Sequence, residues 1–495
     1  MTDNPRIVIA GTQSGVGKTS LTLAIVAALR KRGLTVQTFK VGPDFLDPTY
    51  LTAASGRPCY NLDGWMTGRD YVCRLFARTS KGADISVIEG VMGLFDGYDP
   101  AGSEGSTAEI ARWLDAPVVL IAEVYGMARS IAAVVKGYGS FEKNLRLAGV
   151  IANRCGSERH ASMLAISLAA EQLPPLVGGI PQDALPNLPS RHLGLVTADP
   201  GNLSPSVLGC LADAFERYAS VDDILGIARG APPINITVDP GDVASLPSFL
   251  KRGRGRFSHT DENPPTSPFT KGGQAGLEID KRISIGVAHD AAFHFYYQDL
   301  FDELEMRGCT LRYFSPLAES RLPDNIDALY IGGGYPEEHA DVLSANRQML
   351  TAVREFSSSG RPVYAECGGL MYLCRTLEKK DSAQYPMAGI IPASTRMLDR
   401  LKSLGYVEVT LKADSLWGAE GATMRGHEFH YSELTADPTA DAAWRAVYAL
   451  KRRRADSAAK EGFQSGRVLA SYSHLHLASR PEALRYFIDH CGADR

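Results

Sequence analysis

The sequence lacks the features that would place this protein in or on a membrane. No apolar run approaches the ~20 residues that a bilayer-spanning helix requires, and the stretch MTDNPRIVIAG has no cationic segment followed by an apolar one, so we expect no cleaved signal peptide. Neither sign of charge dominates, since the formal net charge is −4. Such a balance offers no general attraction to anionic lipid or nucleic acid, and we expect neither membrane nor nucleic acid as a partner.

Cysteine is sparse and shows no pairing pattern. The chain has eight cysteines in 495 residues, with no CxxC pair and no compact framework. Such spacing is typical of buried free thiols in a reducing compartment rather than of a disulfide scaffold. We therefore predict a cytoplasmic protein.

Short β-rich runs alternate with helix-like segments, which predicts an α/β fold. In the first half the β-rich runs are RIVIAG, LTVQTFK, DISVIEG, PVVLIAEV, LAGVIANR and LVGGIP. Few internal polar residues interrupt them, as expected for a parallel sheet covered on both faces. The alternation resumes at RISIGVAHD and includes PVYAEC, LGYVEVTL and RVLASYSHL, so the sequence predicts a second α/β domain.

A segment of different composition separates the two regions. Residues 251–281 are rich in Gly, Pro, Ser and charge, with too few spaced apolar side chains for a core, which predicts a flexible linker. We predict a P-loop domain over 1–235, a connector and linker over 236–281, and a second domain over 282–495. The basic run KRRR at 451–454 lies in a stretch that we predict to be a solvated helix.

The stretch AGTQSGVGKTS, residues 10–20, follows a predicted strand and opens a predicted helix, which is the position of a phosphate-binding loop. Glycines let backbone N–H groups converge on phosphate oxygens, a lysine reaches the terminal phosphates, and a hydroxyl holds magnesium. Thr12 stands where the first glycine of such loops is usual. The predicted nucleotide contacts are Gly11, Thr12, Gly15, Val16, Gly17, Lys18 and Thr19. The loop resembles that of dethiobiotin synthetase, and Gln13 replaces the second lysine of the partitioning and nitrogenase iron-protein ATPases, which disfavours a nucleotide-switch ATPase.

Carboxylates follow two predicted strands, at the sheet edge where ligands of open α/β folds bind. KVGPDFLDPTY supplies Asp44 and Asp47, and VIEGVMGLFDGYD supplies Glu89 and Asp96. Magnesium is a hard cation that prefers oxygen ligands. The predicted metal ligands are Thr19, Asp44 and Glu89, and the predicted contacts to substrate or a reaction intermediate are Asp44, Asp47 and Asp96. Any one of these aspartates, taken alone, also fits a solvated loop residue or helix cap.

A second set of motifs indicates a nucleophile. PVYAECGGLMYL is an apolar strand that ends at Cys367, two glycines and a helix-like run, as in nucleophiles held on a sharp strand-to-helix turn. ALYIGGGYPEE ends another strand with three glycines, so that the N–H groups of Gly333 and Gly368 can form an oxyanion hole. A thiol needs a base, and SYSHLHLAS supplies two histidines. Alone, the cysteine motif also fits a buried thiol in a tight turn.

The glycine turn, the Cys-Gly-Gly stretch and the late histidines together resemble the class I glutamine amidotransferase domain. Over nearly its whole length the chain resembles the cobyrinic acid a,c-diamide synthase family, on AGTQSGVGKTS, KVGPDFLDPTYL, NLDGWM, VIEGVMGLFDG, GMARS, PSRHLGL, GGGYPEE, AECGGLMYL, RGHEFHYS and SHLHLAS. The resemblance implies ATP and Mg²⁺ as cofactors and a tetrapyrrole and L-glutamine as substrates. It implies amidation of the a and c carboxylates through an acyl phosphate, with Asn153 as an adenine contact.

Three alternatives remain open on the sequence. The motifs describe the reaction rather than the ring, so sirohaem or nickel-sirohydrochlorin would serve as substrates by the same mechanism. Cobyric acid synthase shares both domain types but amidates other carboxylates. A regulatory P-loop ATPase with a degenerate amidotransferase domain is an alternative of another class, which the intact Cys367 disfavours. A homodimer is one possible assembly.

The two histidines of SHLHLAS need separate assignments. On a strand, His474 and His476 would share one face, since side chains alternate. Class I amidotransferases commonly have His-x-Glu here, the histidine as base and the glutamate orienting it. By position we therefore predict that His474 activates Cys367 and that His476 has a weaker orienting or structural role.

Overall fold

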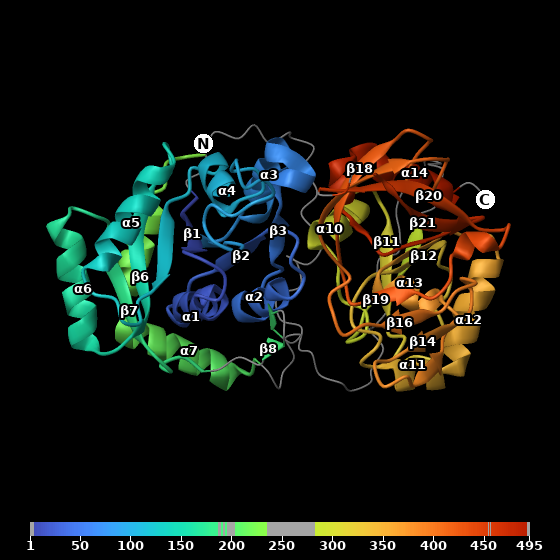
Figure 1. Ribbon diagram of the computed structural model, residues 1–495, viewed down its shortest axis with the longest axis horizontal. Coiled ribbons are helices and arrows are strands. Elements are labelled where there is room, and N and C mark those ends of the chain that lie inside the picture. Colours follow the sequence, from blue (N-terminus) through green and yellow to red (C-terminus); the bar gives the residue numbers. More distant parts are fainter. Residues whose placement is uncertain are drawn as a thin grey trace, which may run out of the picture.

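The structure is a computed structural model that describes residues 4–186, 190–191, 194–195, 203–234, 283–453, 455 and 457–492. These residues form two α/β domains side by side, with β3 of the first and α10 of the second at the junction (Figure 1). The predicted connector and linker, 236–281, lies outside the described residues. Within the described part of the chain, no helix combines the length and apolar character needed to cross a membrane.

A seven-stranded sheet forms the centre of the first domain, in the order β3-β2-β4-β1-β5-β6-β7. All neighbouring strands run parallel, which confirms the predicted parallel sheet. The strands are β1 (Arg6–Gly11), β2 (Val36–Val41), β3 (Tyr60–Leu62), β4 (Ile85–Glu89), β5 (Val118–Glu123), β6 (Leu147–Cys155) and β7 (Leu176–Pro181). A separate antiparallel pair is formed by β8 (Ser190–Arg191) and β9 (Gly194–Leu195).

Helices cover both faces of this sheet, because successive strand residues point to opposite sides. Ile7 and Ile9 pack towards α1, α2, α7 and α8, whereas Val8 and Ala10 share a cluster with α3 and α4. Further along the second face lie α5 and α6. The bounds are α1 (Lys18–Lys31), α2 (Asp47–Ser55), α3 (Gly64–Thr79), α4 (Thr107–Trp113), α5 (Ser130–Phe141), α6 (Glu158–Ala170), α7 (Pro205–Tyr218) and α8 (Val221–Arg229).

The second domain is built on a ten-stranded mixed sheet, in the order β11-β10-β12-β13-β22-β21-β20-β17-β18-β23. Neighbours from β11 to β22 are parallel and the remaining pairs are antiparallel. The strands are β10 (Ser284–Ala288), β11 (Thr310–Phe314), β12 (Ala328–Ile331), β13 (Val363–Glu366), β17 (Ser403–Leu411), β18 (Thr423–His430), β20 (Arg445–Arg452), β21 (Ala459–Ser465), β22 (Val468–Ser471) and β23 (His474–Leu475). The helix predicted around 451–454 is wrong, because Lys451 and Arg452 end β20.

Helices α10 (Gln298–Met306) and α14 (Pro481–Gly492) cover one face of this sheet. The other face carries α11 (Ala340–Ala345), α12 (Arg347–Ser358) and α13 (Gly368–Leu373). A small sheet, β15-β14-β16-β19, joins β14 (Thr376–Glu378), β15 (Gln384–Pro386), β16 (Thr395–Met397) and β19 (Ser432–Leu434). Two 3₁₀ turns, η2 (Pro438–Ala440) and η3 (Leu477–Ser479), complete the domain.

The two domains share one buried hydrophobic cluster. Phe45, Leu46, Trp65 and Met66 of the first domain belong to the same cluster as α10 and α14 of the second. Hydrogen bonds cross the same boundary: the hydroxyl of Tyr60 donates to Asp302 over 2.8 Å, that of Tyr71 donates to Asp299 over 2.6 Å, and Arg78 pairs with Glu303 at 2.8 Å. Because apolar burial and polar pairing coincide here, we treat the boundary as a packed interface.

Candidate active sites

The predicted phosphate loop connects β1 to α1, with Lys18 as the first residue of the helix. Gly15 and Gly17 have φ of 80° and 90°, values that only glycine adopts without strain. Gly11 and Gly17 are also required by space: a methyl group at Gly11 would lie 2.6 Å from Val16 Cγ2, and one at Gly17 would lie 2.5 Å from Asn153 Nδ2. The loop is therefore held in a shape that other residues would disrupt.

Side chains around the loop brace its backbone. The Nζ of Lys18 donates to the backbone carbonyl oxygens of Gln13 and Met92, and the hydroxyl of Tyr138 donates to the backbone carbonyl oxygen of Thr12. The amide of Asn153, at the end of β6, donates to Val16 O over 2.8 Å. Asn153 thus lies directly beside the loop.

A buried lysine that we did not single out in the sequence lies among the predicted carboxylates. The Nζ of Lys40 is 2.5 Å from Asp47 Oδ2, 2.8 Å from Glu89 Oε1 and 3.9 Å from Asp44 Oδ2. Burial alone would lower the pKa of this ammonium, but Asp47 and Glu89 outweigh burial and hold the pKa above its ordinary value. The available signal was a lysine inside the apolar strand run TFKV, four residues before Asp44.

Burial and the charge of Lys40 together set the pKa values of its neighbours. Burial, together with the positive charge of Lys40, lowers the pKa of Lys18 to about 8. Burial also raises the pKa of Glu89 to about 7, although Lys40 opposes that shift. Ligand phosphates brought between Lys18 and Lys40 would add negative charge and favour both ammonium forms.

The oxygen atoms around Thr19 suit a hard cation. The Thr19 hydroxyl donates to Glu89 Oε1 over 2.8 Å and lies 3.4 Å from Asp47 Oδ2, and Glu89 Oε2 is buried without a hydrogen-bond partner. Within the described residues, no group of three or more His, Cys, Asp or Glu side chains is arranged around a metal position. Magnesium, however, commonly takes one or two carboxylates and completes its shell with water and substrate phosphates. The residues present fit that pattern.

The other two predicted acids lie at the rim of this cluster. Asp44 Oδ1 accepts the backbone N–H groups of Leu46 and Asp47, so that it fixes the turn into α2, and burial raises its pKa to about 8. Asp96 Oδ2 accepts the N–H of Gly93 over 2.9 Å. Asp47, rather than Asp44, is the aspartate closest to the Thr19 hydroxyl and to Lys40.

Cys367 lies on the sharp turn between β13 and α13. Its φ of 47° is in the left-handed region, a strained conformation for a residue with a side chain. The Cys367 N–H donates to Ser471 O over 2.7 Å, which ties the turn to the end of β22. Burial raises the pKa of its thiol above the ordinary value, so the free thiol is protonated and needs a base.

The predicted oxyanion glycines and His474 meet at this turn. A methyl group at Gly333 would lie 2.5 Å from Cε1 and 3.3 Å from Nε2 of His474, and one at Gly368 would lie 3.1 Å from the N atom of Gly334. The carbonyl of Gly333 accepts N–H bonds from His294 and Phe295, which fixes the orientation of the glycine turn. The glycine turn at Gly333 thus lies against both the imidazole of His474 and the turn that carries Cys367 and Gly368.

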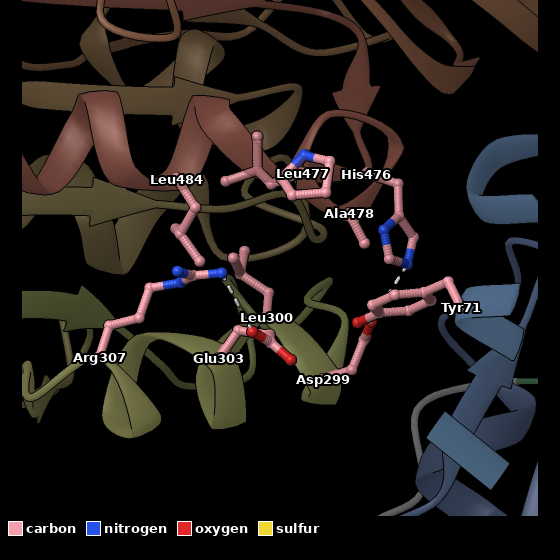
Figure 2. A pocket seen from close by; sticks show the side chains of 10 residues that line it. Tyr71, Asp299, Leu300, Glu303, Arg307, His476, Leu477, Ala478 and Leu484 are labelled. Atoms are coloured by element: carbon pink, nitrogen blue, oxygen red, sulfur yellow. Dashed lines mark hydrogen bonds and ion pairs between the residues drawn. The ribbon is translucent and has the colours of Figure 1, made fainter. Parts of the chain in front are cut away.

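The two histidines separate in the structure, because β23 ends at Leu475 and His476 precedes η3. His474 stacks on His427 with ring centroids 5.0 Å apart. His476 turns towards the domain boundary, where its Nε2 lies 3.4 Å from Asp299 Oδ2 (Figure 2). Its ring also packs on that of Tyr297. A shared face for the pair required one strand through both residues, and the strand does not continue to His476.

A single segment of the first domain contacts both sites. Asp47 lies at the phosphate-loop cluster, whereas Phe45, two residues earlier, packs on the rings of Phe295, His427 and His474 with centroid distances of 5.2, 5.3 and 5.1 Å. The sequence motif PDFLD contained both functions, but the apolar phenylalanine carried no sign of its partner.

Two family models match this chain. One, described as a CobQ/CobB/MinD/ParA nucleotide binding domain, matches residues 7–196. The other, described as a CobB/CobQ-like glutamine amidotransferase domain, matches residues 284–482. Each model covers one of the two sites.

Relatives match along the full length. A cobyrinate a,c-diamide synthase of Syntrophotalea carbinolica is 52% identical over 98% of this chain and 98% of its own. Proteins of the same name from Leptospira interrogans and Archaeoglobus fulgidus are 42% and 38% identical over 98% of this chain, and over 98% and 97% of their own lengths.

Proposed function

Because the chain belongs to the cobyrinate a,c-diamide synthase family, we propose that its two sites perform the two halves of one amidation. The enzyme is an ATP-dependent carbon–nitrogen ligase with glutamine as nitrogen donor. In the first domain, ATP phosphorylates a peripheral carboxylate of cobyrinic acid and leaves ADP. Ammonia then attacks the acyl phosphate, giving the amide and inorganic phosphate, first at one of the a and c carboxylates and then at the other.

We assign the phosphoryl half to the loop of Gly11–Thr19 and its cluster. Lys18 and Lys40 would offset negative charge on the transferring phosphoryl group. The loop would also hold ATP in line with the carboxylate that it phosphorylates. Thr19, Asp47 and Glu89 would hold Mg²⁺, which neutralises phosphate charge when bound. Asp44 and Asp96, at the rim, would contact substrate, and Asn153 would contact adenine.

We assign the glutaminase half to Cys367 and His474. His474 takes the thiol proton, Cys367 attacks the side-chain amide of glutamine, and the N–H groups of Gly333 and Gly368 stabilise the oxyanion. Collapse of the tetrahedral intermediate releases ammonia and leaves a thioester. Water then hydrolyses the thioester to glutamate and regenerates the thiol.

The observation that carries this proposal is the segment from Asp44 to Asp47. Its Asp47 lies 2.5 Å from Lys40, and its Phe45 packs on the ring of His474 with the ring centroids 5.1 Å apart. Ammonia released near the acyl phosphate reacts before it is lost to solvent, and this segment contacts both sites.

Location and assembly are proposals as well. All eight cysteines are free thiols, which supports a reducing compartment such as the cytoplasm. We propose a homodimer as the assembly, and light scattering of the purified protein distinguishes it from a monomer.

Substrate choice is tested by mass. Cobyrinic acid, sirohaem and nickel-sirohydrochlorin are offered separately with ATP, Mg²⁺ and glutamine, and the products are weighed by mass spectrometry. We expect cobyrinic acid to gain two amides and the other two rings to remain unchanged. Amidation of another ring with cobyrinic acid unchanged would contradict the substrate assignment.

The division of labour is tested by Cys367→Ala. We expect loss of glutamine-dependent amidation by at least ~10³-fold, because no nucleophile remains, and retention of amidation with added ammonium chloride. Product mass and glutamate release are measured in parallel. If ammonium-dependent amidation also disappears in a folded variant, the assignment of the two sites to separate half-reactions is wrong.

A further inference from the structure

The glutaminase base lacks an acid at the position where the sequence pattern puts one, since residue 476 is a histidine that faces Asp299. An imidazole acting as base needs a partner that fixes its tautomer and stabilises its protonated form. The Nδ1 atom of His474 is buried and makes no hydrogen bond in the structure. The structure therefore raises the question of which group serves this nitrogen.

One carboxylate lies against that nitrogen. Glu366 Oε2 is 3.7 Å from His474 Nδ1, and both side chains are almost fully buried. Because the Nε2 and Cε1 edge of the same ring faces Gly333, the two edges of the imidazole face different groups. Nδ1 faces an acid, whereas Nε2 faces the glycine turn beside the nucleophile.

Glu366 is held in place by three donors. The hydroxyl of Tyr330 donates to Oε2 over 2.9 Å, the hydroxyl of Tyr364 donates to Oε1 over 2.6 Å, and the N–H of Leu475 donates to Oε1 over 3.2 Å. Hydrogen bonds to a carboxylate stabilise its charged form even when it is buried. The three donors therefore fix the orientation of the carboxylate.

Neighbouring acids are engaged elsewhere. Asp299 faces His476 and accepts from Tyr71, and Glu428 forms a two-pronged pair with Arg452 at 2.6 and 2.9 Å. Among the residues that the structure describes, Glu366 is the acid within ion-pair distance of His474.

We propose that Glu366 is the positioning residue of the glutaminase, a third member that completes the Cys367–His474 pair from the strand end immediately before the nucleophile. It accepts a hydrogen bond from Nδ1–H of His474, which leaves Nε2 free to accept the thiol proton, and as a carboxylate it stabilises the imidazolium that forms. The 3.7 Å separation shortens to a hydrogen bond once glutamine is bound, as is common for catalytic pairs. This assignment rests on the proposed function of Cys367 and His474.

The direct test is Glu366→Gln, which removes the charge and keeps one carbonyl acceptor, enough for either Tyr330 or Tyr364. We expect glutaminase kcat to fall on the order of 10²- to 10⁴-fold, with KM for glutamine changed less than about threefold. The acid limb of the kcat/KM profile moves to lower pH, because the protonated imidazole loses its stabilising carboxylate while His427 still stacks on it. Glu366→Asp, which restores the charge, recovers part of the rate.

Matched variants separate positioning from folding. Glu461→Gln removes another buried carboxylate of the same sheet, one that accepts from Ser471 and Tyr472, and it should keep kcat within about threefold. Tyr364→Phe removes one donor from Glu366 and should lower kcat by about three- to tenfold. Ammonium-dependent amidation of cobyrinic acid should persist in every variant.

Two results distinguish the hypotheses. If Glu366→Gln keeps kcat within threefold and the acid limb does not move, while Cys367→Ala is inactive, Glu366 is structural and the proposal is wrong. If the native enzyme does not amidate cobyrinic acid with ammonium, the proposed function fails independently, because the Glu366 assay follows glutamate release alone.

Discussion

His474 and His476 are one residue apart in the chain, but each lies against its own acid, Glu366 and Asp299 respectively. The difference follows from the backbone, which leaves β23 after Leu475 and enters η3. A two-residue period would place both rings on one side, so a turn between them decides which histidine can serve Cys367.

Alanine at each histidine should have unequal effects. His474→Ala should lower glutaminase kcat by at least ~10³-fold, since the thiol loses its base. His476→Ala should keep kcat within about tenfold but lower the melting temperature, because packing on Tyr297 and the pair with Asp299 are lost. Glutamate release and thermal unfolding measure the two effects. Equal loss of kcat in both variants would contradict the assignment.

The candidate site was predictable where its chemistry is local in the sequence. The glycines of the phosphate loop and the Cys367 turn need special backbone geometry, which a short motif reveals. Lys40 and Glu366 were missed because a charged residue in a strand is usually expected to face solvent. The folded sheet shows instead that each is buried beside its partners. Their roles depend on contacts distant in sequence.

At the level of elements, the turn that leads from β2 into α2 is shared by both sites. It is short, with Phe45 at one site and Asp47 at the other, and Asp44 anchors it by accepting two backbone N–H groups. Asp47 pairs with Lys40 and Phe45 packs on His474, so contacts to the two sites lie two residues apart in this turn.

Phe45→Ala should uncouple the half-reactions. Loss of the ring opens the packing around His474, so ammonia escapes, and the glutamine consumed per amide formed should rise from one to about two or more. Phe45→Leu, which keeps apolar volume, should raise the ratio less, and Phe141→Ala, at an exposed site of the same domain, should leave it unchanged. Glutamate and product are quantified together. A ratio of one in Phe45→Ala would show that the ring does not couple the sites.

Most of the fold was predictable because short stretches of sequence distinguish strands from helices. The sequence predicted a helix, however, where the structure has the end of β20. The run RAVYAL is almost continuously apolar and is followed by KRRR, so its sequence shows neither the alternation of a half-buried strand nor the 3.6-residue period of a helix. The segment becomes a strand because it pairs with β17, which lies more than 30 residues earlier in the chain, and with β21, which follows it.

For the whole molecule, the interface between the domains contains buried acids. Burial raises the pKa of Asp302 to about 6, although the hydroxyl of Tyr60 and the amide of Gln298 donate to it and favour its ionised form. An acid with a raised folded-state pKa contributes stability that is present below its unfolded pKa, near 3.9, and lost as pH rises through about 6. The interface is thus weakened by this group at neutral pH.

Asp302→Asn should therefore stabilise the protein at pH 8. We expect the free energy of unfolding to rise on the order of 1–3 kcal/mol, because the buried charge is removed while Tyr60 retains an acceptor. The gain should shrink at pH 5. Thermal unfolding at both pH values measures it, with Asp324→Asn, in an exposed loop, as control. A gain independent of pH would contradict the linkage.

The segment around Phe45 also limits how the enzyme can be recombined. Domain exchange normally treats each catalytic unit as portable, but here Phe45, encoded with the ATP-binding half, packs on the ring of His474, the proposed glutaminase base. A chimera that takes its second half from a distant relative would join a foreign histidine pocket to this phenylalanine. Successful hybrids should be those in which Phe45 and its aromatic partners come from the same parent.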